Sequence, residues 1–551
     1  MNNKFIKSIC QLFLLSLLLI SACKKDKSAD EPKDEECGNT KQTATSDRVE
    51  LTNDSIFLYA KQIYYWNDEL PCYDQFEPRQ YTSGSNLTKY ENNLLAIAQS
   101  TQEKYDVYTY QDNSGNTLYT NKFSYIEDVS NANGISAGVK NLSSSVNLQG
   151  KGNDIGIYDI SAYGPSDNDF ELFIKAVSPG SPAAQAGLTR GTLITKIGSE
   201  TIGDDWDTDI QSINLLFNDP SSVHLEGKKA DSTAYSVNLE KKAYTSSPIY
   251  KDTILSISGK NIGYLAYARF SDSDNSEEAL DDVFQKFSIK NIEDLVVDLR
   301  YNGGGYVTTA AYLANLIVPN GTSGTMFTEY YTQSLQDGQV DILKNQPVRN
   351  SKGDIVGTST YADYDYTPNG QGNTTKFSKK GNLSGVKNIV FLVTANTASA
   401  SELLINSLRA VPSLTVKLVG TTTYGKPVGF FPVRLEGIYD LYLPSFTTKN
   451  ANNEGDYYKG FTPGDEISGK NMVDEMGQDL DNFSVYDFGD KKESYLAEAL
   501  NQLGVNTTIS TASRIMSIRS NQNNQNAPIN LLKNKPEKKV FKGMIETRIG
   551  N

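Results

Sequence analysis

The sequence of 551 residues contains a single histidine, His224, and only four cysteines. A zinc centre with two or three imidazole ligands cannot be built from one such chain, and a Ser-His-Asp relay would have to use His224. The cysteines are scattered and lack the spacing of a metal site. We therefore expect no metal and no cofactor, and we interpret His224 as a strand residue without a chemical role.

Basic residues are scarce relative to acidic ones, with 52 Lys and Arg against 66 Asp and Glu and a formal net charge of −14. Binding to a phosphate backbone needs concentrated Lys and Arg, so nucleic acid is a poor candidate partner. The composition, 38% hydrophobic and 21% charged, is typical of a soluble globular protein. The length corresponds to about two to four domains.

The apolar run at residues 12–20 is too short for a stable membrane span. It follows Lys4 and Lys7 and predicts a signal peptide over residues 1–22. The run ends in Leu-Ile-Ser-Ala-Cys, which resembles the lipobox of bacterial lipoproteins and implies that Cys23 is lipidated. An ordinary signal peptide with an incidental cysteine is the alternative. We expect a lipid-anchored protein of the bacterial cell envelope, on the periplasmic or the surface face of the outer membrane.

The segment after Cys23 is rich in charge and poor in apolar residues, so we interpret residues 23–46 as a lipidated, flexible tether. With Cys23 lipidated, Cys37 and Cys72 remain, and an oxidising envelope would let them pair if their geometry allows.

Residues 47–140 are predicted to form a small, mainly helical domain, because Ile56, Tyr59, Ile63 and Trp66 recur at three- and four-residue intervals. Aromatic residues at this spacing are typical of a core. We therefore assign this segment a structural role.

Residues 150–245 have short β-type runs between turn signals. The sequence at 176–188, Ala-Val-Ser-Pro-Gly-Ser-Pro-Ala-Ala-Gln-Ala-Gly-Leu, resembles a bacterial PDZ domain. Ile155, Gly156 and Ile157 lie where that family has its carboxylate-binding loop. Such a loop presents backbone N–H groups to a peptide's terminal carboxylate while the peptide adds as a strand. The resemblance therefore implies peptide binding at these three residues.

Residues 250–500 alternate strands with helices, which predicts a mostly parallel α/β sheet whose sites lie beyond the carboxyl ends of the strands. The predicted strand at 295–299 runs into Arg-Tyr-Asn-Gly-Gly-Gly and then a helix. Glycines at that place let the backbone approach a ligand and aim N–H groups at negative charge. A tight structural turn is the alternative.

The predicted strand at 388–394 runs into a sequence that contains Ser399 and Glu402 and again begins a helix. A serine at such a turn is held at the sheet edge, where backbone N–H groups can bind an oxyanion. A plain helix cap, with Glu402 in the first turn, is the alternative.

The predicted strand at 414–419 runs into residues 420–427, which match most of a phosphate-binding loop. Such a loop needs Ser or Thr after its lysine and opens a helix, whereas Pro427 follows Lys426, so we exclude nucleotide binding. Lys426 has no acidic residue within eight positions. A buried lysine is the natural base for a serine where no histidine is available, because desolvation can lower a lysine pKa by ~3 units.

Together these residues resemble the C-terminal processing peptidases, also called tail-specific proteases, which are Ser/Lys serine peptidases with an embedded PDZ domain. The sequences at 298–305, 397–402, 419–426 and 460–463 carry the resemblance. It implies an α/β fold with a crotonase-like ββα peptidase core at 250–500, an inserted PDZ-like β domain and a small helical N-terminal domain. It further implies acyl-enzyme chemistry with Ser399 as nucleophile and Lys426 as general base. Oxyanion and supporting groups would come from Gly304, Gly305, Ala400, Ser401 and Glu402.

One departure concerns the position four residues after the lysine, where the family often has a glutamine that orients the amine and this sequence has Phe430. The third residue of the site therefore stays open. We expect a membrane-anchored serine endopeptidase that cleaves accessible C-terminal tails of proteins or peptides after PDZ recognition. The alternative is a non-catalytic peptide-binding lipoprotein on a peptidase scaffold. Residues 501–551 are expected to form a partly disordered appendage.

Overall fold

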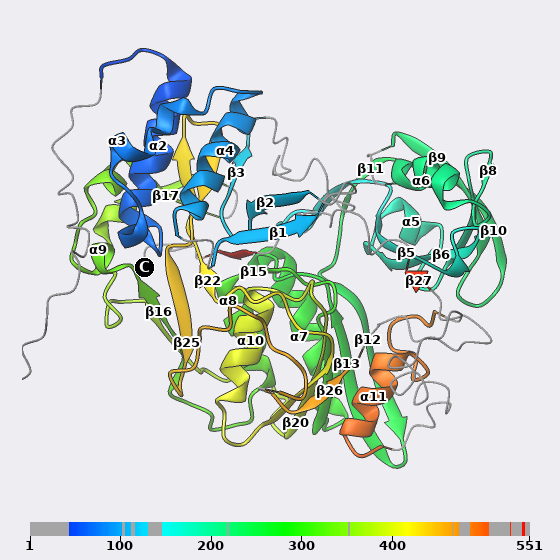
Figure 1. The fold of residues 1–551 in the computed structure, drawn as a ribbon. Coiled ribbons are helices and arrows are strands. Elements are labelled where there is room, and N and C mark those ends of the chain that lie inside the picture. Colours follow the sequence, from blue (N-terminus) through cyan, green and yellow to red (C-terminus); the bar gives the residue numbers. More distant parts are fainter. Residues whose placement is uncertain are drawn as a thin grey trace, which may run out of the picture. The chain divides into compact units, whose positions relative to one another are not determined.

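The computed structural model describes residues 43–101, 105–111, 116–130, 146–216, 220–350, 353–465, 467–472 and 485–505 (Figure 1). Of residues 529–530 and 543–545, only the backbone is described. The predicted signal peptide, Cys23, Cys37 and the tether up to residue 42 lie outside these ranges. Within them, no helix combines the length and the apolar character needed to cross a bilayer.

The chain divides into two units. The described part of the smaller unit comprises residues 43–45 and 72–77, with the short helix α3 (Tyr73–Phe76). It includes Cys72, which is disulfide-bonded. The larger unit comprises residues 46–71 and 78–551 and contains all the elements considered below.

The N-terminal part of the larger unit begins with two helices. Asp47 caps α2 (Arg48–Ile63), and Ser85 caps α4 (Asn86–Gln99). The predicted helical character ends at this point, because β-branched and aromatic residues then favour extended backbone. Three strands follow: β1 (Val107–Gln111), β2 (Thr117–Asn121) and β3 (Tyr125–Asp128).

Strand β3 joins this N-terminal part to residues far later in the chain. It pairs antiparallel with β24 (Tyr439–Tyr442), which also pairs with β23 (Val433–Leu435). Tyr125 lies opposite Tyr442, and their rings stack with centroids 4.4 Å apart. The residues just before β3 are thereby held against the α/β core.

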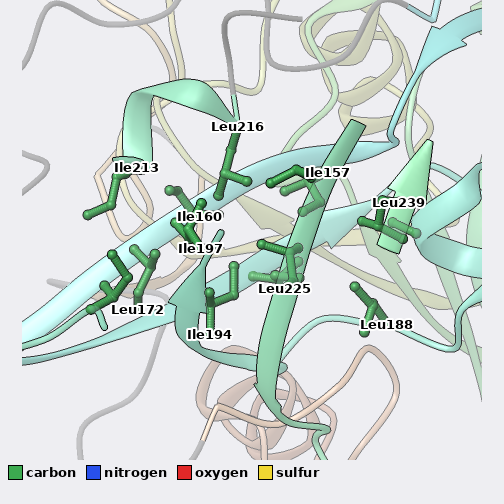
Figure 2. Packing of buried hydrophobic residues seen from close by; sticks show 14 of the residues in the cluster. Ile157, Ile160, Leu172, Leu188, Ile194, Ile197, Ile213, Leu216, Leu225 and Leu239 are labelled. Carbon is green, nitrogen blue, oxygen red and sulfur yellow. The ribbon is translucent and has the colours of Figure 1, made fainter. Parts of the chain in front are cut away.

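Residues 151–245 form a β domain with its own hydrophobic cluster. Strand β4 (Lys151–Asp154) pairs with β11 (Lys242–Thr245), which brings the two ends of the segment together. Aliphatic side chains from several strands, such as Ile160, Leu172 and Leu225, pack in one cluster (Figure 2). The main sheet has the order β10 (Ala234–Glu240), β9 (Ser222–Lys228), β7 (Leu193–Ile197), β6 (Asp169–Val177), β5 (Ile157–Ser166) and β27 (Ile529–Asn530). Strand β8 (Glu200–Thr201) pairs with β7. The helices of this domain are α5 (Pro182–Gln185) and α6 (Trp206–Leu215).

Residues 249–505 contain the α/β core (Figure 1). Its sheet has the order β12 (Ile249–Ile257), β13 (Lys260–Tyr267), β14 (Asp294–Asp298), β20 (Asn388–Val393), β21 (Thr415–Gly420) and β26 (Gly469–Asn471), and only the β12 pairing is antiparallel. The helices are α7 (Ser273–Ile289), α8 (Val307–Ile317), α10 (Ala400–Arg409) and α11 (Ser494–Gln502). Leu496 and Leu500 of α11 pack on Val296 and Val390 in the middle of the sheet. The predicted α/β class is confirmed.

Shorter strands surround this core. A four-stranded sheet has the order β19 (Thr374–Lys376), β16 (Thr325–Tyr331), β25 (Phe446–Asn450) and β22 (Val428–Gly429). A two-stranded sheet joins β17 (Pro347–Arg349) to β18 (Ile355–Thr360), and the short helix α9 (Gln333–Gln336) precedes it. The backbone of β28 (Gly543–Ile545) pairs in parallel with β15 (Gly304–Tyr306).

Candidate active site

The three predicted strand-end sequences lie side by side, because β14, β20 and β21 are parallel neighbours in the sheet. Their carboxyl ends therefore meet at one edge. Residues 300–305 follow β14, residues 394–399 follow β20 and residues 421–427 follow β21. We name these segments the glycine loop, the serine loop and the lysine loop.

Ser399 lies at the junction of the serine loop and α10 in a strained backbone conformation. Its φ of 61° and ψ of −113° fall outside the regions that residues other than glycine favour. The residue is fully buried, and Oγ has no hydrogen-bond partner among the described residues. A buried hydroxyl without a partner costs about 1–3 kcal/mol and is typical of a reactive or strained site.

The buried carboxylate of Glu402 connects the serine loop to the lysine loop. Its Oε2 accepts the backbone N–H groups of Ser399 and Lys426, each at 2.9 Å. Its Oε1 accepts the Gly425 N–H at 2.8 Å and the Thr423 hydroxyl. Burial raises the pKa of the Glu402 carboxyl, and these four hydrogen bonds oppose that rise. Because both N–H groups share one oxygen atom, the backbone nitrogens of Ser399 and Lys426 lie no further apart than twice 2.9 Å.

The glycine loop is fixed by Asn302. Its Oδ1 accepts the Gly304 N–H at 3.0 Å, and its backbone oxygen accepts the Ser401 hydroxyl at 2.9 Å. Gly305 has a φ of 139°, and a Cβ atom there would lie 2.0 Å from the Phe270 carbonyl oxygen, so only glycine fits. In this conformation the Gly304 N–H, one predicted oxyanion donor, is bonded within its own loop.

The other predicted oxyanion donor, Ala400, occupies the first position of α10. A backbone N–H at that position has no acceptor within its own helix. Ser401 also donates its backbone N–H to Ala398 at 3.1 Å, and Ala398 donates to the Asn302 carbonyl at 3.1 Å. The structure thus brings Ala400, Ser401 and the glycine loop together where the sequence placed them.

Lys426 is fully buried, and its backbone leads directly into β22 and not into a helix. This is the geometry expected once a phosphate-binding loop is excluded. The Nζ atom donates to the Phe123 carbonyl oxygen at 3.5 Å and lies 4.2 Å from the centroid of the Phe430 ring. The position of the missing glutamine is therefore occupied by an aromatic ring in contact with the amine.

Arg300 anchors the start of the glycine loop through two buried carboxylates. It is almost completely buried and donates to Asp298 through Nη2 at 2.6 Å and to Glu493 through Nη1 at 2.7 Å. A buried guanidinium needs such partners, because an unpaired buried charge is strongly destabilising. Arg300 is therefore a structural support of the loop.

In the β domain, the predicted carboxylate-binding residues lie at the start of β5. Ile155 and Ile157 point into the hydrophobic cluster, and Figure 2 shows Ile157 among its members. Gly156 has a φ of 88°, and a Cβ atom there would lie 1.9 Å from Ser181 Oγ. The Gly156 carbonyl accepts the Ser178 N–H at 2.9 Å. Any contact with a peptide carboxylate would thus use the backbone of this turn and not the isoleucine side chains.

Sequence reasoning did not identify several residues that contact the site. Asn302 and Thr423 lie within the quoted motifs, and their short polar side chains beside glycines were the available signal. Phe123 and Asp106, whose carboxylate accepts the Phe123 N–H, lie in a tyrosine-rich segment that carries no motif. His224, on β9, contacts Asn238 and Glu226 in the β domain.

The residues that the structure describes contain no group of three or more His, Cys, Asp or Glu side chains suited to hold a metal ion.

Comparison with known proteins gives two family matches. Residues 261–464 match the model of peptidase family S41, and residues 173–225 match a PDZ domain model. The carboxy-terminal processing protease CtpA of Bacillus subtilis is 24% identical over 266 residues, which are 47% of this chain and 45% of that protein. The carboxyl-terminal-processing protease of a Synechocystis strain is 25% identical over 273 residues, 48% of this chain and 50% of that protein. The chain thus spans about half the length of the curated relatives it matches.

Among solved structures, an S41 family protein from Bacteroides fragilis matches with a TM-score of 0.53 and 20% sequence identity. The match covers 85% of this chain and all of that protein, which shows a shared fold. The predicted resemblance and the predicted combination of a peptidase fold with a PDZ domain are confirmed.

Proposed function

We propose that this chain, in which a PDZ domain precedes a domain of peptidase family S41, is a membrane-anchored serine endopeptidase that processes protein tails. The observation that carries the proposal is the Glu402 carboxylate, which holds the backbone N–H groups of Ser399 and Lys426 on one oxygen atom. A nucleophile and a base on adjacent loops, beside a glycine loop, form the constellation needed for acyl transfer.

In the proposed reaction, the neutral Lys426 amine takes the proton of Ser399 Oγ as that oxygen attacks the scissile carbonyl carbon. The N–H groups of Ala400 and Gly304 bind the oxygen of the tetrahedral intermediate. Its collapse breaks the C–N bond, and Lys426 returns the proton to the leaving amine. Water, deprotonated by Lys426, then attacks the acyl carbon, the ester C–O bond to Ser399 breaks, and Lys426 returns the proton to Ser399 Oγ.

Two rearrangements separate the described conformation from this reaction. The Gly304 N–H must exchange the Asn302 oxygen for the oxyanion, and Ser399 Oγ must gain a hydrogen bond to the Lys426 amine. Catalytic hydrogen bonds often tighten only when substrate is bound. Because Ser399 and Lys426 are both fully buried, substrate entry also has to open the site.

The substrate class follows from the PDZ domain. Such domains take an extended peptide as an added strand, with the terminal carboxylate on a backbone turn. The turn at Gly156 leads into β5, and the start of this strand, before the residues Tyr163 and Gly164 that pair with β27, is proposed to pair with the peptide. Proteins or peptides with accessible C-terminal tails are therefore the proposed substrates, and no nucleotide or nucleic acid takes part.

Anchoring and location in the cell envelope are supported by the sequence around Cys23. Incorporation of a radiolabelled fatty acid into the wild-type protein, and its loss in Cys23→Ser, would support the anchor. A Cys23→Ser protein that still carries label would contradict it.

The peptidase is tested with an unfolded substrate such as β-casein. Ser399→Ala and Lys426→Ala should each lower kcat by at least about 10³-fold, because both act in every chemical step. Ser407→Ala, also buried on α10, and Lys417→Ala, whose amine binds the Gln502 carbonyl, are the matched controls and should retain activity. Undiminished cleavage by a purified, folded Ser399→Ala or Lys426→Ala protein would overturn the assignment.

The non-catalytic alternative draws on Phe430, which stands where the resembling peptidases often have a glutamine. It is not favoured, because the amine of Lys426 is buried and contacts a carbonyl oxygen in place of the glutamine.

A further inference from the structure

The amine of the proposed base is held from outside the α/β core. Lys426 Nζ donates to the carbonyl oxygen of Phe123, a residue 303 positions earlier in the chain. The Phe123 ring itself lies 5.7 Å from Nζ, and the Phe430 ring lies 4.2 Å from it. Two aromatic rings therefore lie against the amine, while the Phe123 carbonyl supplies a hydrogen-bond acceptor.

Phe430 cannot replace the acceptor that a glutamine would supply. Its ring is fully buried and packs against Tyr125 and Tyr442, with centroids 5.5 and 5.1 Å apart. These contacts make the ring part of an aromatic cluster that also includes Tyr306. The acceptor function at this position therefore has to come from another group.

The Phe123 backbone is positioned by the fully buried carboxyl group of Asp106. Asp106 Oδ1 accepts the N–H of Phe123 at 2.6 Å and that of Ser124 at 2.9 Å. Its Oδ2 accepts the Ser124 hydroxyl and the Tyr64 hydroxyl, the latter at 3.1 Å. The Asp106 carbonyl also accepts the Lys122 N–H at 2.9 Å. The backbone N–H groups of Lys122, Phe123 and Ser124 thus all donate to Asp106.

Other charged groups face the same region. Glu402 receives the Lys426 backbone N–H, and Lys122 Nζ donates to the Tyr458 carbonyl at 2.8 Å. Burial lowers the pKa of the Lys122 amine, with the charges of Glu402 and Asp106 opposing this. Burial raises the pKa of the Asp106 carboxyl; its hydrogen bonds and the charge of Lys426 oppose that rise.

We propose that the Phe123 carbonyl, held in place by Asp106, positions the Lys426 amine and takes over the role of the glutamine that Phe430 replaces. Asp106 acts as a positioning residue, because its carboxyl oxygens bind Phe123, Ser124 and Tyr64. The proposal rests on the proposed peptidase function. It adds that the N-terminal part of the chain contributes to the surroundings of the base.

The first experiment compares Asp106→Ala, Asp106→Asn and the control Asp54→Asn in the full chain, with kcat, KM and their pH dependence measured on β-casein. Asp54 is also buried in the N-terminal part but binds Arg79. We expect Asp106→Ala to lower kcat about 100-fold with little change in KM, because a small displacement of a catalytic group has effects of this size. Asp106→Asn should recover part of this loss, since its remaining oxygen can still accept both backbone N–H groups.

The pH profile gives a readout that a merely structural role would not move. The negative charge of Asp106 and the fixed Phe123 carbonyl both stabilise the protonated Lys426 amine, so their loss should lower the pKa of that amine. The acidic limb of the pH profile of kcat should therefore move to lower pH by about one unit. Asp54→Asn should leave that limb unchanged even if it lowers the thermal midpoint. Wild-type kcat and an unmoved limb in folded Asp106→Ala and Asp106→Asn would overturn the proposal, as would the same shift in Asp54→Asn.

Two further measurements keep the test decisive. If Asp106→Ala does not fold, Ser124→Ala removes only one hydroxyl donor to Asp106 and should shift kcat and the limb in the same direction by less. If the wild type cleaves nothing, the proposed function fails. The positioning of the Lys426 amine is then tested separately by NMR. The ¹³Cε resonance of Lys426, assigned by its loss in Lys426→Arg, should titrate at lower pH in Asp106→Asn. A resonance that titrates as in the wild type would overturn the positioning role alone.

Discussion

The serine side and the lysine side of the site are held in different ways. On the serine side, Thr397 Oγ1 donates to the Leu299 carbonyl at 2.7 Å and Ser401 Oγ donates to the Asn302 carbonyl at 2.9 Å. These bonds join the loops of two adjacent parallel strands. On the lysine side, Glu402 holds the backbone of Lys426, but its amine contacts Phe123 of the N-terminal part. Both backbones are thus fixed within the α/β core, whereas a hydrogen-bond acceptor of the base comes from a distant segment.

Glu402→Gln should have the largest effect on cleavage, because this carboxylate holds both sides together. A glutamine would present an amide NH₂ to groups that are themselves donors, leaving at least one buried N–H group unpaired at a cost of about 1–3 kcal/mol. We expect loss of cleavage together with a lower free energy of unfolding, measured by chemical denaturation. The matched control is Glu329→Gln, a buried glutamate that accepts the Tyr331 hydroxyl. Equal effects of the two changes would show that Glu402 has no special connecting role.

Phe430→Gln restores the residue common in the family and tests the lysine side alone. We expect no gain of activity and a loss of about 3–5 kcal/mol in stability, because a polar amide would enter a cluster of buried rings. Phe431→Gln is the control: that ring is also buried and stacks on Tyr361, with centroids 4.5 Å apart. It should cost similar stability without moving the pH profile of kcat/KM. Higher activity in Phe430→Gln would show that the Phe123 carbonyl is a poor substitute.

Asn302→Ala tests the serine side alone. It removes the acceptor of the Gly304 N–H and the donor to the Tyr267 carbonyl, so we expect a loss of about 1–3 kcal/mol and a lower kcat. The pH profile should stay in place, since neither group contacts the amine. Asn93→Ala, a buried asparagine that donates to the Asn53 carbonyl, controls for stability alone. A displaced pH profile in Asn302→Ala would show that the serine side also affects the titration of the base.

His224→Ala should have the smallest effect. The ring lies on β9 of the β domain, where its nitrogen atoms form hydrogen bonds with Asn238, Glu226 and Ser236. Cleavage rates of the variant and the wild type should coincide across the pH range. A clear loss of activity would mean that the single histidine has a role that the Ser/Lys chemistry does not explain.

The sequence was sufficient to predict the three loops, because each follows a strand with a clear apolar run and contains residues whose local role is readable. The strands at 294–298, 388–393 and 415–420 end within one residue of the predicted positions. Parallel neighbours place their ends at one edge, so Ser399, Lys426 and the glycine loop could be predicted to meet.

The support of the lysine could not be predicted in this way. The acceptor from Phe123 is a backbone carbonyl, and because every residue has one, the residue type does not mark it. Asp106 is one of 66 acidic residues, and nothing in its surroundings in the sequence distinguishes it. The mainly helical expectation for residues 47–140 also missed β3, whose pairing with β24 brings Phe123 to the site. Pairing partners separated by hundreds of residues leave no local pattern in one sequence.

The ion pair between Arg300 and Glu493 has a consequence for the order of synthesis. Arg300 and Glu493 are 193 residues apart, and α11, which covers the sheet, follows Glu493 directly. A ribosome that has not yet released this stretch leaves the guanidinium with only part of its counter-charge and the sheet with an uncovered face. The buried guanidinium of Arg300 therefore gains its full set of partners only after residue 493 has been synthesised.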